Sequence, residues 1–257
     1  MSLHPTENRS PAQARDGLRV SVVLPCLNEA ETVGICVCKA LETLRRLHVG
    51  GEVVVVDNGS SDGSPAIGQR AGARVVHETR RGYGSAIMRG VEEARAPFII
   101  IADSDDSYDL RELKPFIDHL SAGADLVNGT RLKGVIKPGA MPALNHFGNV
   151  FFVMLFRVLF GAGISDVHTG MRAFSKDTFR RMSLSTPGFE FVSEMIVKAK
   201  LAGLRIDEIP ITHSPAGRGR APHLRPFRDG WRHLRLILKL AVNRAAVAHE
   251  LRVGARQ

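Results

Sequence analysis

The sequence contains little cysteine and no long uninterrupted apolar run. Its three cysteines, two of them in Cys36-Val37-Cys38, exclude a disulfide framework and match no recognisable zinc spacing, which favours a reducing, cytoplasmic setting. The most apolar stretch, residues 147–163, is interrupted by Arg157 and is shorter than the roughly 18 to 20 apolar residues that a membrane span needs. We expect it to form an amphipathic or buried helix.

The N-terminal residues lack the apolar core of a signal peptide. Residues 1–17 are polar and contain proline, so we expect them to form a flexible leader. The chain as a whole has 257 residues, 44% of them hydrophobic and 24% charged, which is typical of a globular α/β domain with additions.

Positive charge is concentrated in one part of the chain. Residues 216–257 contain nine arginines and Lys239 against Asp229 and Glu250, a net charge of 10 − 2 = +8 out of +9 for the whole sequence. The preceding residues are therefore almost neutral. This distribution argues against a nucleic-acid partner for the whole domain and favours phosphate groups or an anionic membrane surface as the partner of the C-terminal segment.

Apolar strands alternate with helical patterns through the first half of the sequence. Strands are predicted at 20–25, 52–57, 73–78 and 98–101, where valine and isoleucine are frequent, and each is followed by a segment predicted to be helical. This alternation predicts a parallel sheet covered by helices on both faces. The pairs Asn28/Glu31 and Asp109/Glu112 have the spacing of capping boxes for two of these helices.

Polar and acidic residues follow three of these strands directly. They occupy residues 25–29, 57–62 and 103–107. Because ligands of open α/β sheets bind beyond the carboxyl ends of the strands, we expect these three segments to converge at one edge.

Asp103 and Asp105 end the fourth strand one residue apart. Two such carboxylates repel each other unless a cation lies between them, and Mg²⁺ or Mn²⁺ bound to a diphosphate is the natural partner, with Ser107 as a further oxygen ligand. A calcium loop is excluded, because Tyr108 and Lys114 occupy the places of its glycine and glutamate. A solvated acidic turn that caps a helix explains the neighbouring Asp106 and Asp109 and is the alternative for the pair itself.

Asp57 ends a run of four valines. The residue suits either a turn of the Asx type or a contact to the base or ribose of a nucleotide, and the pattern leaves both open.

Several motifs in this order resemble the family 2 glycosyltransferases of the GT-A fold. They are VVLPCLNEAETV, VVVVDNGSSDGS, RGYGSAIMRG and IIIADSDDSYD, followed by DLVNGTRL, DVHTGMRAFSKD and GFEFVSEM. The resemblance covers residues 18–240 and is greatest to the branch of dolichol- and polyprenyl-phosphate sugar synthases. It implies a Rossmann-like mixed, mostly parallel sheet with helices on both faces, a UDP-, GDP- or ADP-sugar donor, Mg²⁺ or Mn²⁺ at the D-x-D motif, and inversion at the anomeric carbon.

The resemblance also implies roles for individual residues. Glu190 contacts sugar hydroxyls or acts as a base, unless it is only a charge at a helix N-terminus. The arginines contact donor or acceptor phosphates, although exposed ion pairs are an alternative for Arg131 and Arg172. The implied nucleotide contacts are Pro25, Asn28, Glu29 and Asp57; the ribose or metal contact is Asp103; the main metal ligand is Asp105; and the arginines are Arg131, Arg172, Arg218 and Arg220.

The C-terminal part departs from the family. Residues 18–215 are expected to form the catalytic domain, and residues 216–257 a basic phosphate-binding loop and an amphipathic helix. Phe227, Trp231, Leu234 and Leu238 lie at helical spacing among arginines, so this helix docks on the domain or rests on a membrane surface.

Three functions are compatible with these residues. The first is transfer of a sugar to a polyprenyl or dolichyl phosphate, by an enzyme in the cytoplasm or peripheral at the cytoplasmic face of the membrane. A glycosyltransferase with a soluble small-molecule acceptor is the second, and a non-catalytic nucleotide-sugar-binding module is the third. Formation of a homo-oligomer is left open.

Overall fold

One mixed sheet organises the chain. The computed structural model describes residues 19–219 and 226–254, and within them seven strands form a sheet in the order β3-β2-β1-β4-β6-β5-β7. Strands β1, β2, β3 and β4 are mutually parallel, β6 is antiparallel to both of its neighbours, and β5 is parallel to β7. The strands are β1 (Val20–Cys26), β2 (Gly51–Asp57), β3 (Arg74–His77), β4 (Phe98–Ile101), β5 (Leu126–Ile136), β6 (Arg172–Ser175) and β7 (Ile206–His213).

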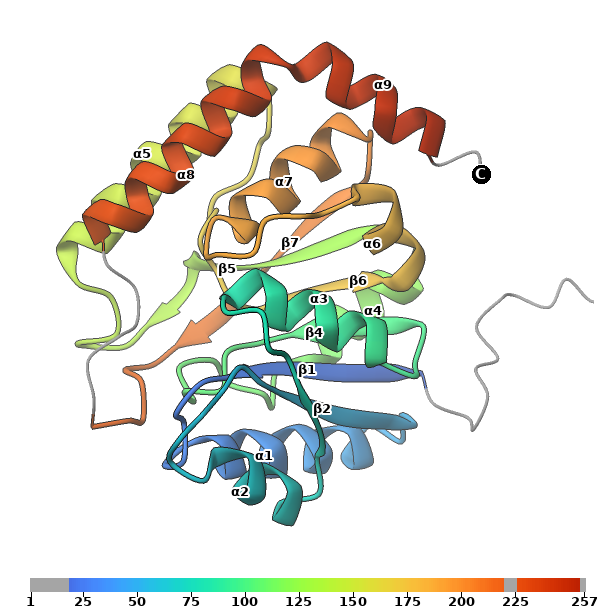
Figure 1. The fold of residues 1–257 in the computed structure, drawn as a ribbon, viewed down its shortest axis with the longest axis vertical. Coiled ribbons are helices and arrows are strands. Elements are labelled where there is room, and N and C mark those ends of the chain that lie inside the picture. The colour runs from blue at the N-terminus through green and yellow to red at the C-terminus, as the bar shows by residue number, and fades with distance from the viewer. Residues whose placement is uncertain (1–18, 220–225, 255–257) are drawn as a thin grey trace, which may run out of the picture.

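Helices cover both faces of this sheet (Figure 1). They are α1 (Val33–Arg46), α2 (Ser64–Arg70), α3 (Tyr83–Glu93), α4 (Leu113–Ser121), α5 (Ala143–Phe160), α6 (Lys176–Met182), α7 (Phe191–Leu201), α8 (Pro226–Val242) and α9 (Arg244–Gly254). The mostly parallel sheet with helices on both faces confirms the fold predicted from the sequence. The strands predicted in the first half are β1 to β4, each within two residues of its expected bounds.

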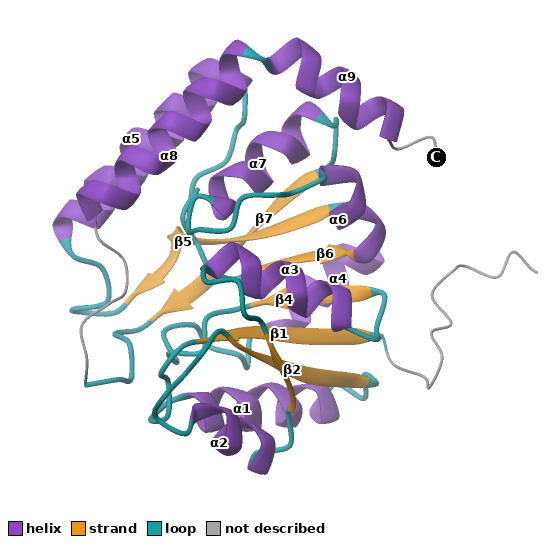
Figure 2. Ribbon diagram, in the orientation of Figure 1, coloured by secondary structure: helices purple, strands orange, loops and turns teal. Residues whose placement is uncertain are grey.

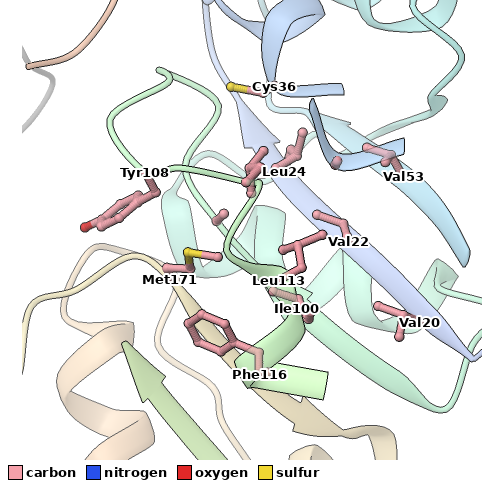
Figure 3. Close-up of a cluster of buried hydrophobic side chains, with 14 of the residues drawn as sticks. Val20, Val22, Leu24, Cys36, Val53, Ile100, Tyr108, Leu113, Phe116 and Met171 are labelled. Carbon is pink, nitrogen blue, oxygen red and sulfur yellow. The ribbon is translucent and has the colours of Figure 1, made fainter. Parts of the chain in front are cut away.

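Two hydrophobic cores lie on opposite faces of the sheet. Val22 and Leu24 of β1 point into one core, with α1 and α4 (Figure 3), whereas Val23 points into the other, with α3, α5 and α7. All three side chains are completely buried. The strands are continuously apolar because they are buried on both sides.

The predicted capping boxes are wrong. Helix α1 begins at Val33, and Asn28 lies five residues earlier in a left-handed conformation, with its side-chain oxygen accepting a bond from Ser61 N (2.7 Å). Glu112 does precede α4, but its carboxylate accepts bonds from the amide and hydroxyl of Thr212 instead of capping. In both cases the side chain that the local pattern predicts to cap a helix forms hydrogen bonds with a residue distant in sequence.

Helices α5 and α8 form an outer layer beyond α7 (Figure 2). They lie side by side and run in the same direction, and α9 continues from the end of α8 (Figure 1). The segment predicted as an amphipathic or buried helix is α5. By length and composition α5 could cross a membrane, and 22% of its residues are buried in the fold.

Candidate active site

The three polar segments converge at the carboxyl edge of β1, β2 and β4. Asn58 N donates to Cys26 O (2.9 Å), so the turns after β1 and β2 are joined. The hydroxyl of Thr32 donates to Ser104 O (2.7 Å), which ties the segment after β1 to the one after β4. The convergence predicted from the sequence is confirmed. We call the carboxylates gathered there, Glu29, Asp57, Asp103 and Asp105, the acidic rim.

Pro25 and Asn28 hold the turn after β1 in place. The Pro25 carbonyl accepts a bond from the Ser104 hydroxyl (2.7 Å), and Asn28 N donates to the Ser60 hydroxyl (2.9 Å). Glu29 N donates to the Ser64 hydroxyl (2.7 Å), and this bond fixes the main chain from which the Glu29 side chain extends. These bonds fix the conformation of the turn, and the nucleotide contacts that the resemblance implies for it stay predictions.

Asp57 lies beside a hollow at the end of β2. Its carboxylate accepts bonds from Ser60 N (2.9 Å) and Gly59 N (3.3 Å) and contacts His77 Nδ1 (3.2 Å). Burial opposes the charge, but these bonds lower the pKa of Asp57 below its usual value. The Asx-type turn is therefore present, and the hollow of about 300 Å³ beside it contains Asp57, His77 and Arg81. A contact from Asp57 to the base or ribose of a nucleotide stays a prediction.

The D-x-D carboxylates are held at fixed positions beyond β4. Tyr83 donates its hydroxyl to Asp103 Oδ1 (3.0 Å), and Ser107 N donates to Asp105 Oδ1 (3.0 Å). Burial and the neighbouring Asp105 raise the pKa of Asp103 to about 7. Gly170 packs so closely against Asp103 that a Cβ at this position would overlap the carboxylate. Two carboxylates therefore share a small space, as the sequence predicts.

Arg218 places a positive charge between two of these carboxylates. Its guanidinium forms an ion pair with Glu29 and another with Asp105 Oδ2 (Nη2 to Oδ2, 3.2 Å). The adjacent Gly217 N donates to Asp105 O (2.8 Å), so the segment that follows β7 is attached to the D-x-D motif. Arg220, which the sequence predicts to act with Arg218, lies outside the described residues.

The other two aspartates of the acidic cluster have separate partners. Asp106 forms an ion pair with Lys39 (2.7 Å), and Asp109 forms one with Arg111 (2.8 Å). Neither carboxylate is bonded to the rim. The interpretation of Asp106 and Asp109 as ordinary turn charges fits these contacts.

Arg131 and Arg172 are engaged inside the fold. Arg131 forms a two-point ion pair with Asp166 (Nε to Oδ2, 2.7 Å; Nη2 to Oδ1, 2.8 Å). Arg172 is completely buried and donates to the main-chain carbonyls of Val192 and Val167. Burial lowers the pKa of Arg172 to about 10. Phosphate contacts by these arginines stay predictions, because the bonds observed here are to the protein itself.

Glu190 lies at the N-terminus of α7, close to the site. No hydrogen bond or ion pair joins its carboxylate to the residues that the structure describes, and the side chain is only partly buried. Next to it, the ring of Phe189 stacks on Tyr83, the residue bonded to Asp103, with ring centres 5.1 Å apart. Glu194, by contrast, accepts bonds from Ser185 N and Thr186 N and pairs with Lys198. Of these two glutamates, only Glu190 is available to a ligand.

A divalent cation with a diphosphate fits the donor set of the rim. Among the described residues no three His, Cys, Asp or Glu side chains come together as a metal site by themselves. Mg²⁺ is commonly bound by one or two carboxylates with phosphate oxygens and water completing the shell. Asp103 and Asp105 supply this partial set, and the guanidinium at Asp105 shows that the position accepts positive charge. Ser107 orients Asp105 through its main-chain amide.

Sequence reasoning missed Tyr83 and His213. Tyr83 belongs to the GYG segment, whose spacing matches no phosphate-binding motif. His213, at the end of β7, stacks on Tyr108 with ring centres 5.2 Å apart, and its Nδ1 is buried without a partner among the described residues. Only the folded chain brings these residues to the D-x-D segment: Tyr83 is 20 positions from Asp103, and His213 is 105 positions from Tyr108.

The fold and the rim define a glycosyltransferase of the GT-A class. Residues 21–183 match the model of glycosyl transferase family 2. The chain therefore belongs to that family, as the resemblance in the sequence indicates.

Two relatives from Haloferax volcanii illustrate the branch. The chain is 41% identical over 221 residues to the low-salt glycan biosynthesis hexosyltransferase. The aligned region covers 85% of this chain and 53% of that protein, so this chain spans about half of the length of that relative. It is 32% identical over 212 residues to the dolichyl-phosphate hexose transferase, covering 82% of this chain and 89% of the relative. These similarities support the polyprenyl-phosphate sugar synthase branch of the family.

A solved structure shares the fold. Glucosyl-3-phosphoglycerate synthase from Mycobacterium tuberculosis, crystallised with Mg²⁺ and uridine diphosphate, superposes with a TM-score of 0.64 over 89% of this chain and 79% of that one. The identity is 22%, so the likeness establishes the GT-A fold.

Proposed function

We propose that this chain transfers a sugar from a nucleoside-diphosphate sugar to a polyprenyl or dolichyl phosphate, with inversion at the anomeric carbon and with Mg²⁺ or Mn²⁺ as cofactor. The observation that carries the proposal is the ion-paired arrangement of Glu29, Asp105 and Arg218, which provides both negative and positive groups at one point. The similarity to the dolichyl-phosphate hexose transferase supports a lipid phosphate as the acceptor.

The donor diphosphate lies, in this proposal, between the D-x-D carboxylates and Arg218. Asp105 and Asp103 would hold the cation, whose positive charge would offset the negative charge of the leaving diphosphate. Arg218 then exchanges part of its bonding from Asp105 to the phosphate oxygens, because a guanidinium binds a phosphate at two points as readily as a carboxylate. Asp57 accepts an N–H of the base in the neighbouring hollow.

The acceptor determines whether a base is needed. An oxygen of a phosphate monoester is already anionic, so it attacks C1 of the sugar while the bond from C1 to the diphosphate oxygen breaks. The nucleoside diphosphate leaves with the bonding electrons, and no proton has to be removed. Glu190, whose neighbour Phe189 stacks on Tyr83, then contacts the sugar hydroxyls instead of acting as a base. We propose that this reaction takes place at the cytoplasmic face of a membrane.

An acceptor comparison tests the proposal. The full chain is incubated with Mn²⁺ and radiolabelled UDP-, GDP- and ADP-sugars, each with a short-chain polyprenyl phosphate or with water-soluble acceptors such as phosphoglycerate. We expect labelled lipid from one donor class and none without metal. Transfer only to a soluble acceptor would contradict the lipid assignment, and the absence of transfer or donor hydrolysis with every donor would contradict the enzyme assignment.

A further inference from the structure

A second cavity lies away from the acidic rim, among the C-terminal helices. It has a volume of about 430 Å³ and is bordered by α6, residues 183–186, α7, α8 and α9. Helix α6 follows β6, which is antiparallel to β4, so Ser175 at the end of β6 lies beside Phe98 at the beginning of β4. The D-x-D motif follows the other end of β4. The cavity is therefore at the edge of the sheet opposite to the rim, where Figure 1 shows α6 and α9.

Basic side chains from three helices meet at this cavity. Four basic and two acidic side chains line it, a net charge of +2. The side chain of Lys239 forms no ion pair or hydrogen bond with any residue that the structure describes. An anion can therefore bind this ammonium group without displacing a partner. The four basic residues are Arg180 and Arg181 of α6, Lys198 of α7 and Lys239 of α8.

The two arginines have acidic partners outside the cavity lining. Arg181 forms an ion pair with Asp125 (3.1 Å), and Arg180 forms one with Asp177 on its own helix. The Arg180 and Asp177 side chains are more than two thirds exposed. Exposed ion pairs contribute little to stability, so both guanidinium groups can exchange these partners for an anion in the cavity.

The two acidic residues leave the positive charge of the cavity in place. Glu194 is buried in the wall, where it pairs with Lys198 (2.8 Å) and accepts bonds from Ser185 N (3.1 Å) and Thr186 N (2.9 Å). Its charge is therefore offset by the protein itself. Glu250 is exposed on α9 and can turn away into solvent.

The wall formed by residues 183–186 is held in place from both of its ends. Lys198 Nζ donates to Ser183 O (2.6 Å) at the beginning of the segment. Just beyond its end, Ser85 N of α3 donates to Pro187 O (3.1 Å). The cavity is thus formed before any ligand arrives, as is usual for small-molecule sites, and its volume is in their range of roughly 300 to 1,000 Å³.

Apolar side chains of α8 and α9 complete the lining. Leu240 and Leu251 are 7% and 5% exposed, so this part of the cavity is shielded from solvent. The two helices are joined by Asn243, whose side-chain amide donates to Lys239 O (2.9 Å). The apolar lining consists of Leu236, Leu240, Val247 and Leu251.

This lining matches a phosphate monoester with a short apolar substituent. Such a monoester carries a charge of about −2 at neutral pH, which complements the net charge of the cavity. A guanidinium group binds two phosphate oxygens at once, and a lysine adds a point charge. Inorganic phosphate would satisfy the basic residues but would leave the apolar lining without a contact.

We propose that this cavity is a second binding site, which takes a small organic phosphate. The phosphate binds among Arg180, Arg181 and Lys239, and the apolar substituent lies against α8 and α9. The site contains no residue of the acidic rim and needs neither a sugar donor nor a divalent cation. The proposal is therefore independent of the proposed function.

Calorimetric titration of the full chain with hexyl phosphate in the presence of EDTA tests the proposal. We expect one molecule to bind, and inorganic phosphate to bind about tenfold more weakly because it buries no apolar surface. Lys239→Gln should weaken binding of hexyl phosphate about tenfold, since it removes a charged donor. The matched control is Arg235→Gln, which changes an exposed basic residue of the same helix outside the cavity, and it should bind like the wild type.

A variant of the acidic rim separates the two sites. We expect Arg218→Gln to bind hexyl phosphate like the wild type. Loss of binding in Arg218→Gln with unchanged binding in Lys239→Gln would place the phosphate at the rim and overturn the proposal. Absence of binding to the wild type, or equal weakening in Lys239→Gln and Arg235→Gln, would also overturn it. Circular dichroism checks that each variant is folded.

Discussion

The acidic rim and the outward sides of α5 and α8 differ in where their side chains find partners. At the rim Asp103 is bonded to Tyr83, and Asp105 to Ser107 and Arg218, so the charges are balanced within the fold. On the outward sides of α5 and α8, apolar side chains such as Phe227, which is 83% exposed, are open to solvent. The rim can therefore take a ligand by exchanging partners that it already has, whereas these apolar side chains have no bonds to exchange.

The largest effect is expected at the rim. Asp105→Asn keeps the shape of the side chain but removes the charge that holds the cation, so we expect transfer to fall about a thousandfold. Asp106→Asn is the matched control, because Asp106 is the next residue, pairs with Lys39 and is not bonded to the rim. Initial rates with saturating Mn²⁺ measure both. Equal loss in the two variants would show that general disruption of the segment, and no specific charge, causes the effect.

The second prediction concerns the packed side of α8. Burial lowers the pKa of His233 to about 4, so the folded state keeps it neutral whereas the unfolded chain, with its pKa near 6.5, takes up a proton. The contribution of His233 to the free energy of unfolding is therefore largest above about pH 6.5 and decreases as the pH falls towards 4. The total decrease from this residue is up to about 3 kcal/mol.

Urea unfolding at several pH values measures this dependence. We expect His233→Gln, which can keep a bond to Ser193, to flatten the curve between pH 6.5 and 4, while His249→Gln on the exposed side of α9 leaves it unchanged. If the His233→Gln curve matched that of the wild type, α8 would not be packed on the domain as described, and the contrast between its two sides would be lost.

A third, smaller effect tests how tightly the rim is built. Gly170→Ala places a methyl group against the Asp103 carboxylate, so we expect a loss of about 1 to 3 kcal/mol in the free energy of unfolding. Gly163→Ala is the control, since a Cβ there meets no atom within 4 Å. Chemical denaturation of both variants gives the comparison. A neutral Gly170→Ala would mean that the rim is looser than the structure shows.

The smallest effect separates the two charges of the rim. Arg218→Gln removes the internal cation, so Glu29 and Asp105 lose a competitor and we expect Mn²⁺ to bind several-fold more tightly in the absence of donor. Turnover should fall about tenfold, since the diphosphate loses its guanidinium. Isothermal titration calorimetry with Mn²⁺ alone provides the readout, with the surface variant Arg111→Gln as control. Weaker Mn²⁺ binding in Arg218→Gln would contradict the proposal that Arg218 and the cation compete for Asp105.

The sequence predicted those parts of the molecule that depend on local pattern. Continuous apolar runs define β1, β2 and β4, since strands covered on both faces need apolar side chains at every position. The convergence of the segments after them follows from the parallel arrangement, and so do the positions of Asp103 and Asp105. The bounds of α5 were predicted less well: the apolar stretch 147–163 is shifted by three to four residues from the helix Ala143–Phe160. The apolar residues of this helix face both the domain and solvent, so they do not mark its ends.

Long-range contacts account for what was missed. Asn28 has the spacing of a cap, but its side chain is bonded to Ser61, 33 residues away. Arg172 is an arginine in a motif of the family, and only the fold shows that two carbonyls and complete burial enclose it. Tyr83 reaches Asp103 because α3 begins at the same edge of the sheet. None of these contacts has a signal within a short window of sequence.

Metal-dependent binding of the donor tests the central claim most directly. The claim is that the acidic rim accepts a divalent cation together with a nucleoside diphosphate. Thermal unfolding of the wild type is measured with UDP-, GDP- and ADP-sugars, with and without Mn²⁺, and repeated with Asp105→Asn and Asp106→Asn. We predict that one donor raises the unfolding temperature only when Mn²⁺ is present, that Asp106→Asn keeps this shift, and that Asp105→Asn abolishes it. An equal shift without metal, or an undiminished shift in Asp105→Asn, would contradict the account.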